Sequence, residues 1–136
     1  MRLGELLIDK NLISESQLVS ALSRQFSSHA KLGECLILGG FIEESVLLET
    51  LAEQLHYGFT QAIDSELITG LSLSIIPKDL AQKWTCIAGY SEPNFIVFAN
   101  DEIEVIKDFL DGFGLSYVIV LTKRSNIRVA VNQFYL

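Results

Sequence analysis

Residues 2–25 read RLGELLIDKNLISESQLVSALSRQ, and residues 31–54 repeat this pattern as KLGECLILGGFIEESVLLETLAEQ. The two copies are offset by 29 positions, and 11 of their 24 aligned residues are identical. A repeat of fixed period indicates one structural unit that occurs twice and packs against its copy. Two copies of one surface also suit a ligand that has two-fold symmetry.

Each copy has the pattern of two short helices. In the first copy, Asn11 can adopt the left-handed conformation that ends a helix. Ser14 and Gln17 then form the capping-box pattern that begins the next helix. Apolar residues follow at helical spacing, and the second copy predicts matching helices over 32–38 and 43–55. Four short helices are therefore expected in the first lobe.

The second half of the chain has the pattern of a mixed lobe. Beyond a loop-rich connector, helical patterns alternate with β-branched and aromatic runs that favour strands. The expected elements are a helix over 76–84, strands over 85–90 and 95–100, a helix over 102–113, a strand over 116–122 and a helix over 125–134. The fold class is therefore α+β, with a tandem helical repeat lobe (1–56), the connector (57–76) and a lobe of about three strands (77–136).

Composition excludes several classes of protein. An apolar fraction of 49% argues against disorder, and a net charge of −7 argues against a protein that binds DNA or RNA. The longest apolar runs are too short to cross a membrane, and no signal-peptide pattern opens the chain. Cys35 and Cys86 have neither a CxxC spacing nor a partner histidine. We expect them to be reduced core thiols of a cytoplasmic protein, not metal ligands.

The sequence carries no catalytic motif. It has no GxxxxGK[ST] phosphate-binding loop, so the chain cannot itself be an ATPase, and it has no GxSxG, HExxH or kinase signature. His29 and His56 have no carboxylate or nucleophile at a motif spacing, and they read as surface or helix-end residues. We therefore expect no enzyme activity, no catalytic residue and no cofactor.

The full repeat motif is RLG, paired aliphatic residues, a turn and LxxxLxxQ, and it resembles the tandem motif of the MshEN family. This family is the N-terminal domain of type II secretion and type IV pilus ATPases of the GspE and PilB kind. The resemblance covers the whole chain, through IPKDLAQKW, ANDEIEVIKDFLDGFGLSYVIV and NQFY. It implies a cytoplasmic module that binds cyclic di-GMP, with each repeat holding one half of the dinucleotide. It also implies a partner, which is an ATPase domain or an inner-membrane platform protein.

The resemblance assigns ligand contacts by position. Arg2 and Lys31 would face guanine or phosphate, Gly4 and Gly33 would let the backbone approach the ligand, and Asp101 would add an acidic contact. Leucines would grip the bases and glutamines would bond their polar edges: Leu3, Leu18, Leu22 and Gln25 in the first copy, and Leu32, Leu47, Leu51 and Gln54 in the second.

The chemistry of these residues fits such roles. Helix N-termini carry unpaired N–H groups and a positive dipole end, which hold phosphates even in an acidic protein. Leucines at i and i+4 form an apolar wall for a flat base, and a glutamine one turn further offers a donor and an acceptor. The same leucine spacing is typical of a helix that packs into a core. Both interpretations of the leucine stripes stay open.

Departures from the motif favour a second hypothesis. Lys31 stands where the motif has arginine, and Asp101 lacks the proline that commonly follows it in the family. These changes and the negative charge suit a docking adaptor that holds the cytoplasmic part of a membrane-anchored secretion or pilus component without binding a nucleotide. A third interpretation takes the chain as the N-terminal fragment of a longer motor protein.

Overall fold

The computed structural model describes residues 2–136, and within them the chain forms eight α-helices, a short 3₁₀ turn and a four-stranded sheet. The expected α+β class is confirmed. The first lobe contains α1 (Leu3–Asp9), α2 (Glu15–Ser28), α3 (Leu32–Leu38) and α4 (Glu44–Leu55). The rest contains β1 (Gly58–Phe59), η1 (Ser65–Leu67), α5 (Gly70–Ser74), α6 (Lys78–Trp84), β2 (Cys86–Ser91), β3 (Asn94–Ala99), α7 (Ile103–Asp111), β4 (Tyr117–Leu121) and α8 (Arg124–Phe134).

Local sequence signals explain the helix boundaries of the repeat. The Ser14 hydroxyl accepts from the Gln17 N–H at 3.2 Å, and the Gln17 side chain accepts from the Ser14 N–H at 2.9 Å, so the predicted capping box begins α2. Asn11 has φ 60° and its counterpart Gly40 has φ 74°. The left-handed turn between the two helices is therefore formed at the same position of each copy.

The first lobe has its own core. The helices α1 and α2 of the first copy pack against α4 and α3 of the second, respectively. The buried residues of this core are Leu7, Ile13, Ala21, Cys35, Leu36 and Leu47. Lys10, the C-cap of α1, also pairs with Glu53 on α4, at 2.7 Å. Each copy therefore buries its apolar face against the other copy.

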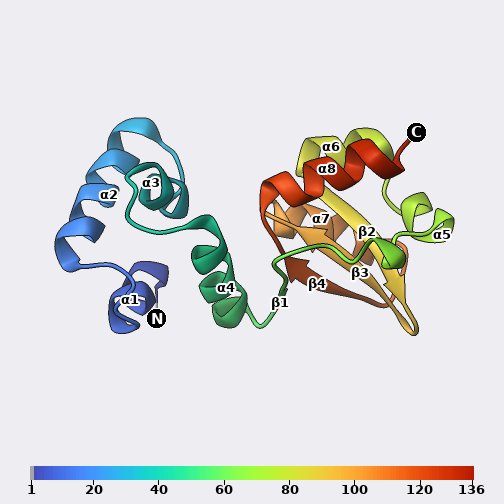
Figure 1. Cartoon of the computed structure of the whole chain (residues 1–136), viewed down its shortest axis with the longest axis horizontal. Helices are drawn as coiled ribbons and strands as arrows, with labels where there is room; N and C mark the ends of the chain where they lie inside the picture. Colours follow the sequence, from blue (N-terminus) through green and yellow to red (C-terminus); the bar gives the residue numbers. More distant parts are fainter. Residues whose placement is uncertain (1) are drawn as a thin grey trace.

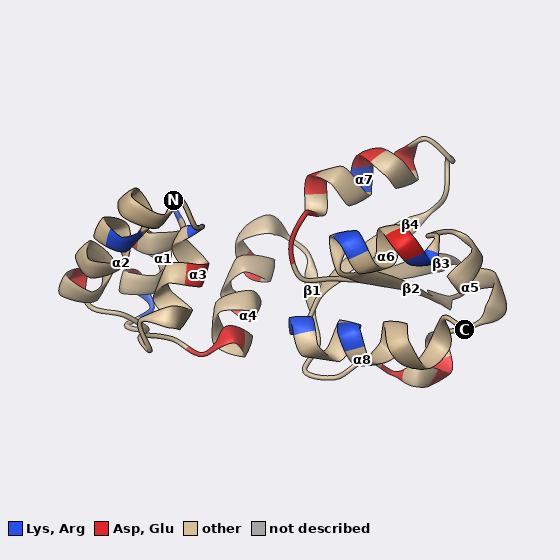
Figure 2. Cartoon of the chain, turned by 90° about the horizontal axis from the view of Figure 1, so that it is seen from above, with Lys and Arg blue, Asp and Glu red and all other residues tan. Residues whose placement is uncertain are grey.

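The sheet has the strand order β1-β4-β3-β2. β4 runs parallel to both β1 and β3, whereas β2 and β3 form an antiparallel hairpin. The helix α7 lies on one side of this sheet and α8 on the other (Figure 2). Buried residues of both helices, including Ile106, Leu110 and Ile127, pack with the strands in a second core. Because helices cover both faces of the sheet, β2 and β3 are rich in fully buried residues.

The connector is more structured than its sequence indicates. We expected loops over 57–76 and about three strands beyond them, but the connector supplies a fourth strand, β1. The Thr60 N–H donates to the Leu121 C=O at 3.0 Å, and the buried Thr122 hydroxyl donates to the Thr60 C=O at 2.9 Å. A two-residue strand carries no detectable pattern, because its pairing depends on contacts distant in sequence.

The helix α4 joins the two lobes (Figure 1). Leu47, in its first half, is buried in the core of the repeat lobe, whereas Ala52, in its second half, is buried in the core of the sheet lobe. One rigid helix therefore sets how the lobes face each other. Across residues 2–136, no helix is long and apolar enough to span a bilayer.

Candidate functional site: a cleft between the lobes

A cleft of about 1030 Å³ lies between the second repeat and the sheet lobe. One wall is formed by α3 and α4, and the opposite wall by the start of α7 and the first half of α8. A volume of this size is at the upper end of the range found for small-molecule sites. The lining is mainly apolar on the repeat side and charged on the sheet side.

The structure brings about half of the expected ligand contacts to this cleft. The residues that line it are Leu3, Lys31, Leu32, Gly33, Leu47, Leu51 and Asp101. The expected residues outside its lining are Arg2, Gly4, Leu18, Leu22, Gln25 and Gln54. The second copy and Asp101 therefore meet in one place, whereas the first copy contributes Leu3 alone to the lining.

The repeated glycines have a packing role within each copy. A Cβ on Gly33 would lie 2.8 Å from Leu47 Cδ2, and a Cβ on Gly4 would lie 2.8 Å from Leu18 Cδ1. Such distances are below van der Waals contact, so any larger residue would displace the leucine. The close approach in each copy is thus between a glycine of the first helix and a leucine of the second. This explains why the two residue types recur together.

An ion pair crosses the cleft between the lobes. Lys31 Nζ lies 2.5 Å from Asp101 Oδ1, and the two side chains are 70% and 38% exposed. The same carboxylate oxygen accepts from the Glu102 N–H at 2.8 Å. An exposed pair of this kind contributes about 0–1 kcal/mol, so a ligand that competes for either partner loses little by breaking it.

A second polar bridge involves Glu44, at the start of α4. Its Oε2 accepts from Asn100 Nδ2 at 3.2 Å and from the Arg124 N–H at 3.4 Å. Asn100 Nδ2 also donates to the Thr122 C=O at 3.0 Å. The start of α4 is therefore hydrogen-bonded to the sheet lobe at two points, just after the end of β3 and at the start of α8.

Two cations of the cleft, Arg124 and Arg128, were not among the residues expected from the sequence. They stand one turn apart on α8 and therefore share a face. Three of the chain's ten Lys and Arg residues fall within the six-residue run KRSNIR, which was the available signal. Figure 2 shows basic residues at the start of α8 and acidic residues at the start of α7, on the wall that faces α4.

The charge pattern gives the cleft two chemically different sides. The positive end of the α8 dipole adds to the two arginines, which favours an anion there. Beside α7, Asp101 and Glu104 offer carboxylate acceptors to N–H donors. The apolar leucines of α3 and α4 face both groups. The arrangement suits a ligand that combines an anionic backbone with flat, donor-bearing rings.

Other reactive groups lie outside the cleft. Both cysteines are buried free thiols, as expected, and burial raises the pKa of the Cys86 thiol to about 12, which suppresses the nucleophilic thiolate. His29 and His56 are exposed helix C-caps. Among residues 2–136, no group of three His, Cys, Asp or Glu side chains is placed to hold a metal ion.

Comparison with known proteins gives matches along nearly the whole chain. No family model matches. The chain is 30% identical, over 98% of its length, to the type IV pilus assembly ATPase PilB of Myxococcus xanthus (strain DK1622), and it spans about a quarter (24%) of that protein.

Solved structures share the fold. The structure of MshE with cyclic di-GMP has a TM-score of 0.82 and 25% identity, and the match covers 99% of both chains. The N-terminal domain of XpsE has a TM-score of 0.76 at 20% identity, which shows a common fold over 99% of this chain and 94% of that one. The resemblance expected from the tandem motif is confirmed: the chain is similar in sequence to the type IV pilus assembly ATPase PilB, and it shares its fold with the structure of MshE and with the N-terminal domain of XpsE.

Proposed function

We propose that this chain is a regulatory module that binds cyclic di-GMP in the cleft between its lobes and passes the signal to an ATPase or platform protein. The observation that carries the proposal is the meeting of the second repeat with Asp101, Arg124 and Arg128 around one cleft. The MshE structure, which shares this fold, contains the same nucleotide. The chain itself acts by binding and performs no catalysis.

The roles of the residues follow from the chemistry of the ligand. Guanine has N–H donors on one edge, and the carboxylate of Asp101 can accept hydrogen bonds from them. The phosphates fit the paired arginines of α8, because a guanidinium bonds a phosphate through two N–H groups. Leu32, Leu47 and Leu51 provide the apolar surface against which a base can lie.

Binding would couple the lobes. The ligand would contact the repeat on one side and the start of α7 and α8 on the other, so it would replace the Lys31–Asp101 pair with a bridge of its own. A ligand shifts a conformational equilibrium by its difference in affinity for the two states. Ordering of the two lobes is therefore the signal that an attached or docked partner would read.

Titration calorimetry tests this proposal. Cyclic di-GMP should bind the intact chain, and Arg128→Ala should weaken binding by about 5- to 30-fold, which corresponds to the loss of one charge-assisted contact of about 1–2 kcal/mol. Arg24→Ala is the matched control, since Arg24 is exposed on α2 outside the lining of the cleft. Cyclic di-AMP serves as the base-specificity control. Absence of heat and of thermal stabilisation with excess cyclic di-GMP would reject the proposal.

A docking adaptor is the second candidate, and the surface of α2 favours it. Val19, Leu22 and Phe26 are 65%, 44% and 86% exposed, and they lie at i, i+3 and i+7 on one face of the helix. Exposed apolar stripes of this kind mark protein contacts. Under this hypothesis Phe26→Ser abolishes pull-down of the cytoplasmic part of the platform protein, whereas Val129→Ser, on α8, leaves it unchanged.

A further inference from the structure

A side chain of the repeat lobe caps the N-terminus of α8. The first N–H groups of a helix have no partner within the helix, and Lys123, the N-cap residue of α8, provides no side-chain cap. Instead, the Arg124 N–H donates to Glu44 Oε2 at 3.4 Å, across 80 residues of sequence. A carboxylate of the chain itself therefore lies where the positive end of the α8 dipole attracts an anion.

A second donor holds Glu44 in this place. The same oxygen accepts from Asn100 Nδ2 at 3.2 Å, and Asn100 Nδ2 also donates to the Thr122 C=O at 3.0 Å. Because a carbonyl can only accept, the bond to Thr122 fixes which end of the Asn100 amide faces the carboxylate. Glu44 lines the cleft together with Arg124 and Arg128, so the basic side of the cleft already contains one negative charge.

The acidic side of the cleft shows the reverse arrangement. Lys31, also from the second repeat, pairs with Asp101, the residue next to Asn100. The second repeat therefore places a carboxylate on the basic side and an ammonium group on the acidic side. Under the proposed function, these are the places of the phosphates and of the guanine N–H donors. Each part of the ligand thus has a chemical counterpart among the chain's own side chains.

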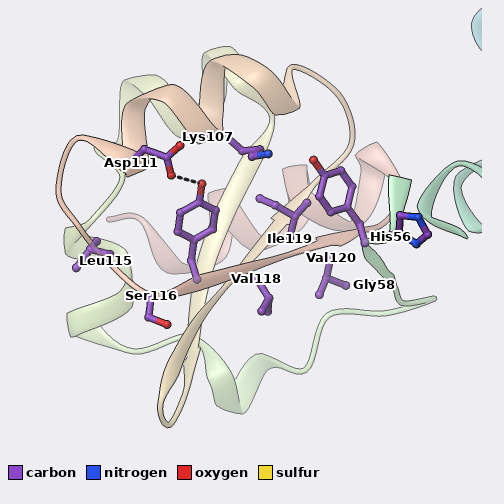
Figure 3. A pocket seen from close by; sticks show the side chains of 11 residues that line it. His56, Gly58, Lys107, Asp111, Leu115, Ser116, Val118, Ile119 and Val120 are labelled. Carbon is purple, nitrogen blue, oxygen red and sulfur yellow. Dashed lines mark hydrogen bonds between the residues drawn. The ribbon is translucent and has the colours of Figure 1, made fainter. Parts of the chain in front are cut away.

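A second pocket, of about 640 Å³ beside β4 and α7, is arranged differently (Figure 3). Its charged side chains are met by tyrosines: Asp111 accepts from the Tyr117 hydroxyl at 2.6 Å, and Lys107 Nζ lies 5.9 Å from the ring centroid of Tyr57. Neither contact joins a carboxylate of one lobe to a helix end of the other. The contact of that kind made by Glu44 belongs to the cleft, where a ligand would have to break it.

We propose that Glu44 is an internal competitor of the anion that binds in the cleft. This inference rests on the proposed function. The Glu44 carboxylate occupies the Arg124 N–H and has to leave it when a phosphate binds there. Its charge also repels the phosphate, because like charges a few ångströms apart interact strongly in a partly enclosed site. Glu44 therefore lowers the affinity for the ligand and sets the concentration at which the module responds.

Departure of Glu44 also affects the contact between the lobes. The bonds to Asn100 and Arg124 join the start of α4 to the sheet lobe, and both are made by one carboxylate oxygen. A phosphate that takes the Arg124 N–H removes Glu44 from one of these donors and repels it from the other. Entry of the ligand is thereby coupled to the packing of α4 against the sheet lobe.

Glu44→Gln tests the proposal, because the amide oxygen can still accept both hydrogen bonds whereas the negative charge is gone. By titration calorimetry, this variant should bind cyclic di-GMP about 5- to 20-fold more tightly than the parent. Glu43→Gln is the matched control, since Glu43 is the exposed N-cap of α4, lies outside the lining of the cleft and loses the same charge. It should bind as the parent does. If Glu44 only caps α8, the affinity of Glu44→Gln is unchanged or lower, and the proposal is overturned.

Inorganic pyrophosphate distinguishes failure of this inference from failure of the proposed function, because it carries the anionic groups without the bases. It should raise the melting temperature of Glu44→Gln more than that of the parent or of Glu43→Gln. If cyclic di-GMP binds neither the parent nor the variant, the proposed function fails and the pyrophosphate comparison decides the role of Glu44. A larger shift for Glu44→Gln then upholds the competition, and equal shifts overturn it.

Discussion

Replacement of Thr122 by valine tests how the connector is fixed to the sheet. Thr122 is fully buried, and its hydroxyl donates to the Thr60 C=O at 2.9 Å and accepts from Asn126 Nδ2 at 3.0 Å. Valine keeps the shape of the side chain and removes both bonds. Asn126 Nδ2 keeps its hydrogen bond to the Gln61 C=O, at 2.8 Å, whereas the Thr60 C=O loses the hydrogen bond from the hydroxyl.

The expected cost follows from these partners. A buried acceptor left without its donor costs about 1–3 kcal/mol, and the added methyl recovers part of this through apolar burial. We expect Thr122→Val to lower the free energy of unfolding by about 2 kcal/mol. For a chain of this length, that corresponds to a fall in melting temperature of roughly 6–8 °C.

Thr50→Val is the matched control. Thr50 is 5% exposed, but its hydroxyl donates at 2.9 Å to the Val46 C=O within the same helix. That carbonyl keeps its helical N–H partner, so removal of the hydroxyl should change stability by less than about 0.5 kcal/mol. Urea unfolding monitored by circular dichroism gives both values. Equal effects of the two substitutions would refute the reasoning, because burial of a hydroxyl alone would then decide the cost.

Three further outcomes are expected. Lys31→Arg should tighten cyclic di-GMP binding about 3- to 10-fold by calorimetry, because it provides a bidentate fork; unchanged or weaker binding would contradict this. Gly40→Ala should cost about 1 kcal/mol in urea unfolding, since φ is 74° there, whereas Asn11→Gly should be neutral or stabilising. Burial raises the pKa of Tyr135 to about 12, above its unfolded value of about 10. Its contribution to the free energy of unfolding is therefore complete below about pH 10 and is lost as the pH rises towards 12. Tyr135→Phe should reduce this alkaline decline of the free energy of unfolding, measured by urea unfolding at a series of pH values.

The regular elements of this fold were predictable from local sequence. Helix periodicity, the Ser14–Gln17 capping box and the turn at Asn11 depend on contacts within a few residues, and all three are confirmed. The hairpin strands β2 and β3 are also confirmed, within one residue at each end. These signals are strong because the apolar faces are continuous and the breakers are of the expected kinds.

The site was less predictable, because it depends on contacts between distant segments. Arg124 enters the cleft because β4 ends near α4 and α8 begins there, with the Arg124 N–H bonded to Glu44, and no pattern in the repeat encodes that path. The short strand β1 forms through pairing of Gly58 with Val120 and of Phe59 with Leu121, which are distant in sequence. Gly33 lines the cleft and stays a predicted point of ligand approach, but no sequence pattern showed that a Cβ there would also meet the side chain of Leu47.

The two copies of the motif lead into different segments of the chain. The helix α4 continues into β1 and packs into the core of the sheet lobe, so Leu51 lines a cleft that has a charged wall opposite. The helix α2 leads into the second copy, and the equivalent Leu22 remains 44% exposed. A duplicated sequence therefore produces one half-site that is enclosed and one that is open. A ligand with two equal halves would meet them unequally, and closing of the open half around it would be a change that a partner could detect.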